Sequence, residues 1–317
     1  MEYTTLSNGV KMPMLGYGVY KIEPQECERC VLDAIGAGNR LIDTAQFYKN
    51  EEAVGEAIKK SAVPREEFFI VDKVWITNSG YIRAKTSIEE SLLKLQTPYI
   101  DLLLIHKPAG DYFGIYRAME EAYREGKVRA IGVSSFNEKE LREIYEFAEI
   151  KPMVNQVETH VFYQRKKLHE CMEELGVKHM SWAPFAEGKR NIFENPVLTE
   201  IGKKHMKSSS QVCLRYMLQS DIILIPKSTH IERMKQNLDI FDFELDREDM
   251  EKLRELNEEK GISPVEISGF PEDCITSFLR QKSSLINNKK SVDSKCDEPQ
   301  VEFTDFSLFQ IVDIILW

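Results

Sequence analysis

The chain has 317 residues, of which 42% are hydrophobic and 30% charged, and 42 Lys and Arg against 52 Asp and Glu give a net charge of −10. This composition excludes a disordered chain, and the negative charge disfavours nucleic acid and anionic membranes, so the expected partners are small molecules. The N-terminal run lacks the apolar stretch of a signal peptide, and no segment reaches the ~20 apolar residues of a membrane span. Six cysteines are too few for a disulfide scaffold. We therefore expect a cytoplasmic protein whose cysteines stay as thiols.

The predicted elements begin with a hairpin, because Asn8-Gly9 lies between two short β-like pieces. Eight short runs rich in β-branched residues or leucine follow, with helical patterns between them. The runs are Leu15–Val19, Arg40–Thr44, Phe68–Trp75, Ile100–His106, Val128–Val133, Met153–Glu158, Lys178–Ala183 and Ile222–Ile225. The helical patterns include Glu23–Ala37, Glu51–Lys60, Ile82–Leu95, Gly114–Glu125, Glu138–Glu149, Gln164–Leu175 and Ser209–Gln219.

Eight strands that alternate with helices predict an α/β fold, the (β/α)8 TIM barrel, with the hairpin as a lid on its bottom. The apolar runs LLLI at 102–105 and IILI at 222–225 suit strands buried on both faces. An open, doubly wound sheet is the less favoured alternative.

The composition changes near Cys274. Residues 281–300 are rich in Ser, Asn, Lys and Asp without periodicity, which is typical of disorder. Residues 301–317 are apolar, but Asp305 and Asp313 interrupt them and they are too short to span a bilayer. Docking on a protein or membrane surface and an extension without function are equal alternatives for them. We predict one barrel domain over residues 1–275 and an irregular, poorly ordered tail over 276–317.

Candidate catalytic residues follow from the rule that barrel active sites lie at the C-terminal ends of the strands. The ends of the second, third and fourth predicted strands carry Asp43, with Tyr48 in the loop behind it, Lys73 and His106. A buried Asp and Lys are costly unless paired, which predicts an ion pair; a purely structural pair is the alternative. We expect the ammonium of Lys73 to lower the pKa of the Tyr48 phenol from its free value of ~10 and to make it a general acid. His106 is then placed to donate a hydrogen bond to a substrate carbonyl oxygen.

Reduction of a carbonyl needs a hydride donor. Neither Gly16-Tyr-Gly18 nor Gly36-Ala-Gly38 continues as G-x-G-x-x-G, so no Rossmann domain is expected. Barrels hold phosphate with the loops after strands seven and eight and with a helix N-terminus. The eighth predicted strand runs into residues 225–237, whose candidate anion ligands are Lys227, Ser228, Thr229 and Arg233. The histidines lack metal-ligand spacing, so no metal is predicted.

Several motifs occur together and in order: DTAQFYKNE at 43–51, Lys73, LLLIHKP at 102–108, NQVETH at 155–160 and IPKS at 225–228. In these motifs the chain resembles the aldo-keto reductases, in particular the bacterial branch of diketo-gluconate and glyoxal reductases, over roughly residues 1–260. The resemblance implies a monomeric barrel that reduces an aldehyde or ketone with NADPH. It implies that the catalytic residues are Asp43, Tyr48, Lys73 and His106, and that the substrate contacts Tyr48, Trp75 and His106.

The same resemblance implies a set of cofactor contacts along the chain. They include Asp43 and three residues after the first strand, Gly18, Val19 and Tyr20. Ser134, Ser135 and Gln156 are placed at the nicotinamide amide, and Trp182 stacks on the ring. Those near the phosphates and the adenine are Ala183, Phe185, Lys227, Ser228, Arg233, Gln236 and Asn237. An NADPH-binding regulatory subunit with slow turnover is the alternative function. A serine hydrolase is not expected, because G-x-S-x-G is absent.

The chain departs from the family pattern at a few positions. Ser135 stands where Asn is usual, so its reach to the nicotinamide amide is shorter, while Trp182 replaces Tyr and Gln236 replaces Glu. Lys107 stands where Gln or a large aromatic is usual and is a candidate for recruiting anionic carbonyl substrates. Strand alternation instead favours a Lys107 side chain that points away from the site. The family's C-terminal loop is not matched after about Ser263, so no substrate identity is predicted.

Overall fold

The computed structural model describes residues 1–262, so the predicted tail and the boundary near residue 275 lie outside the described residues. Eight parallel strands form one sheet in the order β10-β9-β8-β7-β6-β5-β4-β3. They are β3 (Tyr17–Gly18), β4 (Leu41–Asp43), β5 (Phe69–Val74), β6 (Leu102–Ile105), β7 (Ile131–Ser134), β8 (Val154–Glu158), β9 (Lys178–Trp182) and β10 (Ile223–Leu224). A parallel bridge between Leu15 and Leu224 joins the two edges. The sheet therefore closes into the predicted TIM barrel.

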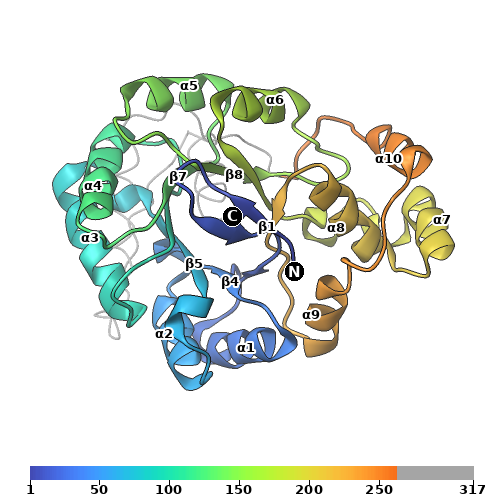
Figure 1. The fold of residues 1–317 in the computed structure, drawn as a ribbon, viewed down its shortest axis with the longest axis horizontal. Coiled ribbons are helices and arrows are strands. Elements are labelled where there is room, and N and C mark those ends of the chain that lie inside the picture. Colours follow the sequence, from blue (N-terminus) through green and yellow to red (C-terminus); the bar gives the residue numbers. More distant parts are fainter. Residues whose placement is uncertain (263–317) are drawn as a thin grey trace, which may run out of the picture.

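The helices surround this barrel (Figure 1). They are α1 (Pro24–Ala37), α2 (Glu51–Lys60), α3 (Tyr81–Lys94), α4 (Tyr112–Arg124), α5 (Glu138–Phe147), α6 (Lys166–Leu175), α7 (Pro196–His205), α8 (Ser209–Gln219), α9 (Ile231–Leu238) and α10 (Arg247–Arg254). The seven predicted helices are confirmed to within a few residues. Helices α7, α9 and α10 were not among the predicted helices. No helix among residues 1–262 is long and apolar enough to cross a membrane.

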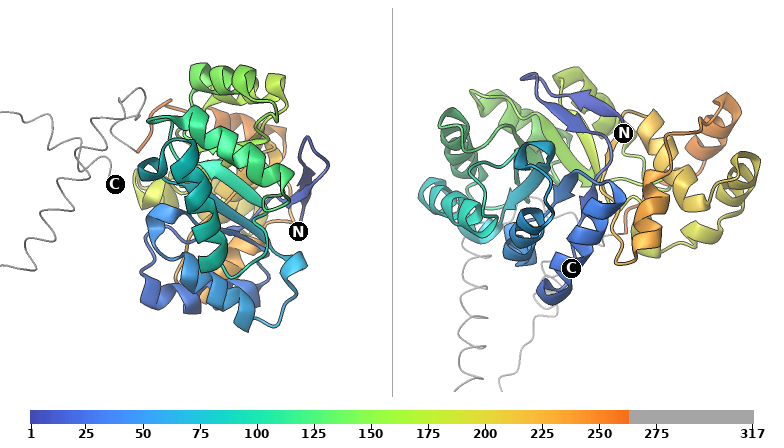
Figure 2. Two further views of the ribbon diagram at one scale, coloured as in Figure 1. Left: turned by 90° about the vertical axis from the view of Figure 1, so that its left-hand side faces the viewer. Right: turned by 60° about the horizontal axis from the view of Figure 1, so that its bottom comes forward.

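The N-terminal hairpin consists of β1 (Tyr3–Thr5) and β2 (Lys11–Pro13), which pair antiparallel. Gly9 has φ +86° in the turn between them, a left-handed conformation that favours glycine. Leu6 and Met12 of this hairpin pack in one buried cluster with Leu41 and Phe69, the first residues of β4 and β5. The hairpin therefore covers the N-terminal end of the barrel, as predicted, and projects from it in Figure 2.

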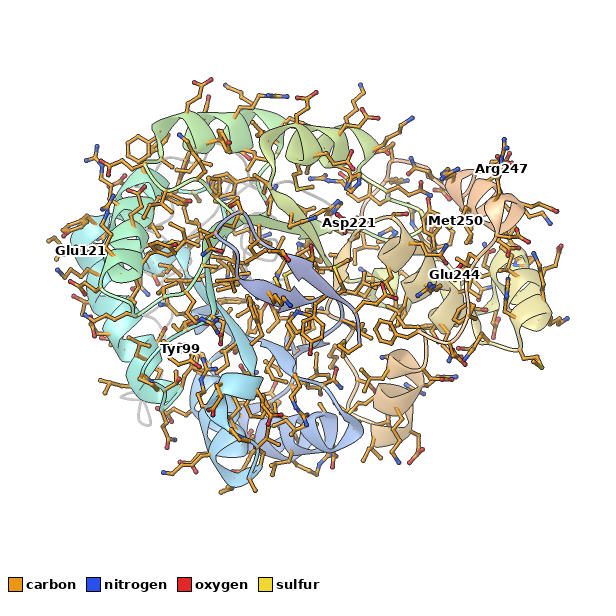
Figure 3. The ribbon with its side chains drawn as sticks, viewed as in Figure 1. Tyr99, Glu121, Asp221, Glu244, Arg247 and Met250 are labelled. Atoms are coloured by element: carbon orange, nitrogen blue, oxygen red, sulfur yellow. The ribbon has the colours of Figure 1, made fainter. Side chains whose placement is uncertain are left out.

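Apolar side chains fill both the barrel interior and the layer between strands and helices (Figure 3). Gly132 on β7 shows how closely the strands approach, because a Cβ there would lie 2.4 Å from the Val154 carbonyl oxygen. A side chain at this position would push β7 away from β8. The close contact keeps Ser134 on β7 in register with Gln156 on β8, and both residues reach the C-terminal end of the barrel.

Candidate active site

The ends of β4 and β5 bring the predicted ion pair together. The Nζ of Lys73 lies 2.6 Å from Oδ1 of Asp43, and both side chains are almost fully buried. Lys73 also donates to the Thr44 carbonyl oxygen at 2.8 Å and reaches the Tyr48 hydroxyl at 3.5 Å. The second carboxylate oxygen of Asp43 accepts a hydrogen bond from Nε2 of Gln156 at 2.6 Å. The ammonium thus connects the carboxylate to the phenol, in an interior that holds the charges only because they are paired.

A 3-10 turn, η1 (Gln46–Tyr48), carries the phenol and begins three residues after β4 ends. Asn50, which was not predicted as a site residue, holds this loop in place by hydrogen bonds. Its Oδ1 accepts from the Thr44 hydroxyl at 2.9 Å, and its Nδ2 donates to the carbonyl oxygens of Val19 and Ile22 at 3.1 and 3.2 Å. The loop that bears Tyr48 is therefore tied to the loop after β3.

Gln46, which was not predicted as a site residue, connects the turn that carries Tyr48 to other elements by hydrogen bonds. Its Oε1 accepts from the Trp75 backbone amide at 2.9 Å and from Asn78 at 2.8 Å. Its Nε2 donates to Oγ of Ser91 at 3.1 Å, and Ser91 in turn donates to the buried Glu51 carboxylate at 2.7 Å. One side chain thus attaches the tyrosine-bearing turn to β5 and α3. The signal available in the sequence was only its position two residues before Tyr48.

The prediction that Lys73 lowers the pKa of Tyr48 is wrong. Burial raises this pKa well above its ordinary value, and the negative charge of Asp43 raises it further. The Lys73 ammonium lies closer to the Asp43 carboxylate than to the phenol oxygen, so its attraction for a phenolate is largely cancelled. Tyr48 is therefore protonated at neutral pH, which is the state that a proton donor needs.

His106 follows the end of β6 and lies in an aromatic wall. Its ring is 5.6 Å from that of Tyr48 and 4.8 Å from that of Trp75, centroid to centroid. Phe47, missed by the sequence analysis, stacks on Trp75 at 4.2 Å. Burial lowers the pKa of His106 well below its usual range, and the ammonium groups of Lys73 and Lys107 lower it further. The imidazole is therefore neutral at physiological pH.

The predicted nicotinamide contacts gather at the ends of β7, β8 and β9. Ser134 is buried on β7 opposite Gln156, and Ser135 follows it with φ +63°. Trp182 ends β9 half-buried, and Ala183 after it has φ +51°. Left-handed backbone at residues other than glycine costs free energy and is concentrated at functional sites. On the opposite side of the same mouth, the Tyr20 ring packs against Tyr48 at a tilt of 42°, with ring centroids 4.9 Å apart.

The structure corrects the prediction for Lys107. Strand alternation favoured a side chain that points away from the site. Instead, Nζ of Lys107 donates to Oγ of Ser135 at 3.0 Å and lies 5.7 Å from the Trp182 ring centroid. The alternation rule fails because β6 ends at Ile105, so His106 and Lys107 are no longer in extended, paired strand geometry. Lys107 therefore faces Ser135 and Trp182, two of the predicted nicotinamide contacts.

The predicted phosphate ligands lie around the N-terminus of α9. Lys227 and Arg233 are exposed, while Ser228 is buried and its Oγ accepts from the backbone amide of His230 at 3.1 Å. Thr229 is half-buried beside them. Of the predicted adenine contacts, Gln236 is exposed and Asn237 is buried, both on α9. The remaining predicted contacts lie at the barrel mouth: Gly18 ends β3, Val19 follows it, and Phe185 lies in the loop after β9.

These donors suit a phosphorylated nicotinamide dinucleotide. Two exposed cations and a helix N-terminus match the phosphate charge. At the other end, hydroxyl and amide groups of Ser134, Ser135 and Gln156 match a carboxamide, and the half-exposed Trp182 offers a ring face for stacking. The residues present therefore fit NADPH.

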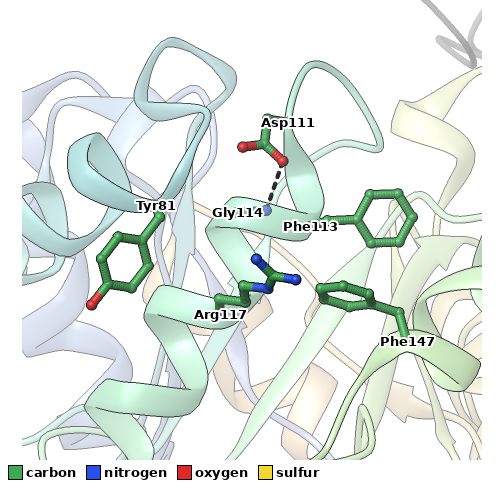
Figure 4. A pocket seen from close by; sticks show the side chains of 6 residues that line it. All are labelled: Tyr81, Asp111, Phe113, Gly114, Arg117 and Phe147. Atoms are coloured by element: carbon green, nitrogen blue, oxygen red, sulfur yellow. Dashed lines mark hydrogen bonds between the residues drawn. The ribbon is translucent and has the colours of Figure 1, made fainter.

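A separate hollow of about 640 Å³ opens on the outside of the barrel (Figure 4). Its lining comes from α3, α4 and α5 and consists of Tyr81, Asp111, Phe113, Gly114, Arg117 and Phe147. None of the predicted site residues lies there.

The strand ends of this closed (β/α)8 barrel bring together a tyrosine, a lysine–aspartate pair and a neutral histidine. The residues beside them fit a dinucleotide. These features together define a class of carbonyl-reducing oxidoreductases. Residues 7–258 match the model of the aldo/keto reductase family. The chain therefore belongs to the aldo/keto reductase family, and it is an NADPH-dependent enzyme that reduces aldehydes or ketones.

Individual relatives agree with this assignment. The glyoxal reductase of Bacillus subtilis (strain 168) is 48% identical over 261 residues, which cover 82% of this chain and 94% of the relative. The crystal structure of MGS-M4, an aldo-keto reductase enzyme from a Medee basin deep-sea metagenome library, is 40% identical with a TM-score of 0.82, covering 85% of this chain and 100% of the other. A Bombyx mori aldo-keto reductase in complex with NADP is 31% identical with a TM-score of 0.80, covering 86% and 98%.

Proposed function

We propose that the enzyme reduces small reactive aldehydes of the glyoxal type, with Tyr48 as the proton donor. The observation that carries the chemistry is the contact of Lys73 with both the Asp43 carboxylate and the Tyr48 hydroxyl, next to the His106 ring. The substrate class is supported by the similarity to a glyoxal reductase along 94% of that protein. The stacked rings of Phe47 and Trp75 lie beside the His106 ring and are proposed as an apolar wall for the substrate.

NADPH, when bound, supplies the hydride that reduces the carbonyl carbon. As negative charge develops on the carbonyl oxygen, the Tyr48 hydroxyl transfers its proton to that oxygen and the alcohol forms. The resulting phenolate faces the Lys73 ammonium at 3.5 Å, which stabilises it until a proton from solvent restores the phenol. The neutral His106 donates a hydrogen bond from its ring to the same carbonyl oxygen and orients it.

Asp43 and Gln156 act on the reaction indirectly, by positioning the Lys73 ammonium. The carboxylate holds the Lys73 ammonium at 2.6 Å and compensates its charge in the buried interior. Gln156 donates to the other carboxylate oxygen and so fixes the carboxylate plane. The two residues keep the ammonium aimed at the phenol.

The cofactor contacts proposed for this chain divide into two groups. Ser134, Ser135, Gln156 and Trp182 hold the nicotinamide end, and Lys227 and Arg233, with the α9 N-terminus, bind the 2′-phosphate. The support is their position at the strand ends and at the start of α9. Further contacts are proposed at Gly18, Val19, Tyr20, Asp43, Ala183, Phe185, Ser228, Thr229, Gln236 and Asn237.

We also propose that the enzyme works as a cytoplasmic monomer whose barrel domain spans residues 1–275. The acidic net charge of −10 supports a soluble protein that does not bind nucleic acid. Size-exclusion chromatography with light scattering tests the monomer, for which a mass near 36.8 kDa is expected.

The experiment for the proposed function is NADPH oxidation followed at 340 nm with glyoxal, methylglyoxal, aromatic aldehydes, sugar aldehydes, diketo-gluconate and 2-keto acids, each repeated with NADH. We expect the highest kcat/KM with the dicarbonyls and with NADPH. Preference for an aromatic or sugar aldehyde would overturn the substrate class. Tight NADPH binding without turnover of any carbonyl would instead favour the regulatory subunit.

A further inference from the structure

Lys107 brings a positive charge to the nicotinamide end of the site. It follows β6, is half-buried, and donates from Nζ to Oγ of Ser135 at 3.0 Å. The same Nζ lies 5.7 Å from the centroid of the Trp182 ring. The ammonium is thus held between the residue after β7 and the last residue of β9, the two positions proposed to hold the carboxamide and the ring of the nicotinamide.

Among residues 1–262, the ionisable groups nearest the proposed reaction centre are either paired or neutral. Lys73 and Asp43 are paired at 2.6 Å and compensate each other. The field of Lys107 reaches the site, since it is one of the charges that disfavour protonation of His106. Tyr48 carries its proton, so it is neutral as well.

We propose that the charge of Lys107 makes the enzyme bind the two redox states of the cofactor with different affinities. NADPH and NADP+ share the adenosine, the pyrophosphate and the 2′-phosphate, but the nicotinamide ring is neutral in NADPH and carries a positive charge in NADP+. An ammonium held against Ser135 and Trp182 repels the charged ring and leaves the neutral ring unaffected. The enzyme then binds NADPH in preference and releases NADP+ readily, which favours carbonyl reduction over alcohol oxidation.

The contact with Ser135 gives Lys107 a second effect on the same group. Because Oγ of Ser135 accepts from the ammonium, its single hydroxyl proton is left to be donated elsewhere. That proton is suited to a carboxamide oxygen. This effect is the same for both redox states, so the ratio of the two dissociation constants isolates the charge effect. The inference rests on the nicotinamide contacts of the proposed function.

The test measures binding without turnover. NADPH and NADP+ are titrated separately into wild type, Lys107→Met, Lys107→Gln and Lys107→Arg, by calorimetry or quenching of tryptophan fluorescence. Lys139→Met, which removes an 85% exposed lysine on α5, is the matched control. In Lys107→Met and Lys107→Gln we expect the ratio Kd(NADP+)/Kd(NADPH) to fall about five- to tenfold. This is the size expected when one unit charge is removed at close range in a half-exposed site. Lys107→Arg and Lys139→Met should keep the wild-type ratio.

An unchanged ratio in both Lys107→Met and Lys107→Gln overturns the inference, and so does a fall of the same size in Lys107→Arg. Circular dichroism on each variant establishes that the barrel is folded. Failure of the proposed function is distinguishable, because it shows as absent turnover or a different preferred carbonyl in the NADPH oxidation assay, whereas the inference fails only in the ratio of the two dissociation constants.

Discussion

The buried ion pair makes a quantitative prediction for the Lys73→Met variant. The side chains of Lys73 and Asp43 are 1% and 2% exposed, so removal of the ammonium leaves a carboxylate that water cannot solvate. Loss of one partner of such a pair costs about 3–5 kcal/mol of unfolding free energy. Methionine has a similar length and volume, so the packing contribution should be small. The hydrogen bond from Gln156 remains and offsets part of this cost.

The pH dependence of this loss has a definite sign. Burial already raises the pKa of Asp43 in the wild type, where the Lys73 ammonium and Gln156 oppose the rise. Without the ammonium the folded-state pKa rises further above the unfolded value of ~3.9. The folded variant then binds a proton more tightly than the unfolded chain, so the loss of stability is largest above the folded pKa and shrinks as the pH falls towards the unfolded value.

Urea unfolding at pH 8 and pH 5 measures both quantities in wild type, Lys73→Met and the double variant Lys73→Met/Asp43→Asn. The double variant no longer buries a charge, so it should regain at least half of the stability lost at pH 8. A loss below about 1 kcal/mol at pH 8 would refute the reasoning. No recovery in the double variant would refute it equally.

Three further predictions concern the chemistry and the cofactor. Tyr48→Phe should lower kcat by about 10²–10⁴-fold while NADPH affinity is retained, because the variant lacks the proton donor. Tyr112→Phe, which removes a hydroxyl that donates to Glu143 on α5, is the control. A Tyr48→Phe enzyme within tenfold of wild type would exclude the assigned role. Lys227→Met combined with Arg233→Met should lower the preference for NADPH over NADH, measured as a ratio of kcat/KM, by about 10- to 100-fold, and an unchanged ratio would place the 2′-phosphate elsewhere. Because the pKa of His106 is held below its usual range, the free energy of unfolding should fall as the pH drops below ~6.5. In urea unfolding, His106→Asn should reduce the pH dependence of this free energy by up to about 1.4 kcal/mol per pH unit. An equal pH dependence in both proteins would contradict this.

Local sequence patterns determined most of the fold. The run FIVDKV, buried at every position of β5, is an example of a strand that only the interior of a parallel sheet accepts. Asn8-Gly9 set the hairpin turn, and helical periodicity set seven of the helices. The residue types at the strand ends, such as Asp43 and Lys73, were also predictable, because a buried charge has few roles other than pairing or catalysis. These features depend on neighbouring residues along the chain.

Other features were decided only by contacts between distant parts of the chain. The direction of the Lys107 side chain depends on where β6 ends and on Ser135, the residue after β7. The raised pKa of Tyr48 depends on burial and on the carboxylate of Asp43, which competes for the same ammonium. The network around Gln46 joins residues about 30–45 positions apart. Periodicity reports which side of an element is buried, but the partner that a side chain meets there is fixed by tertiary packing.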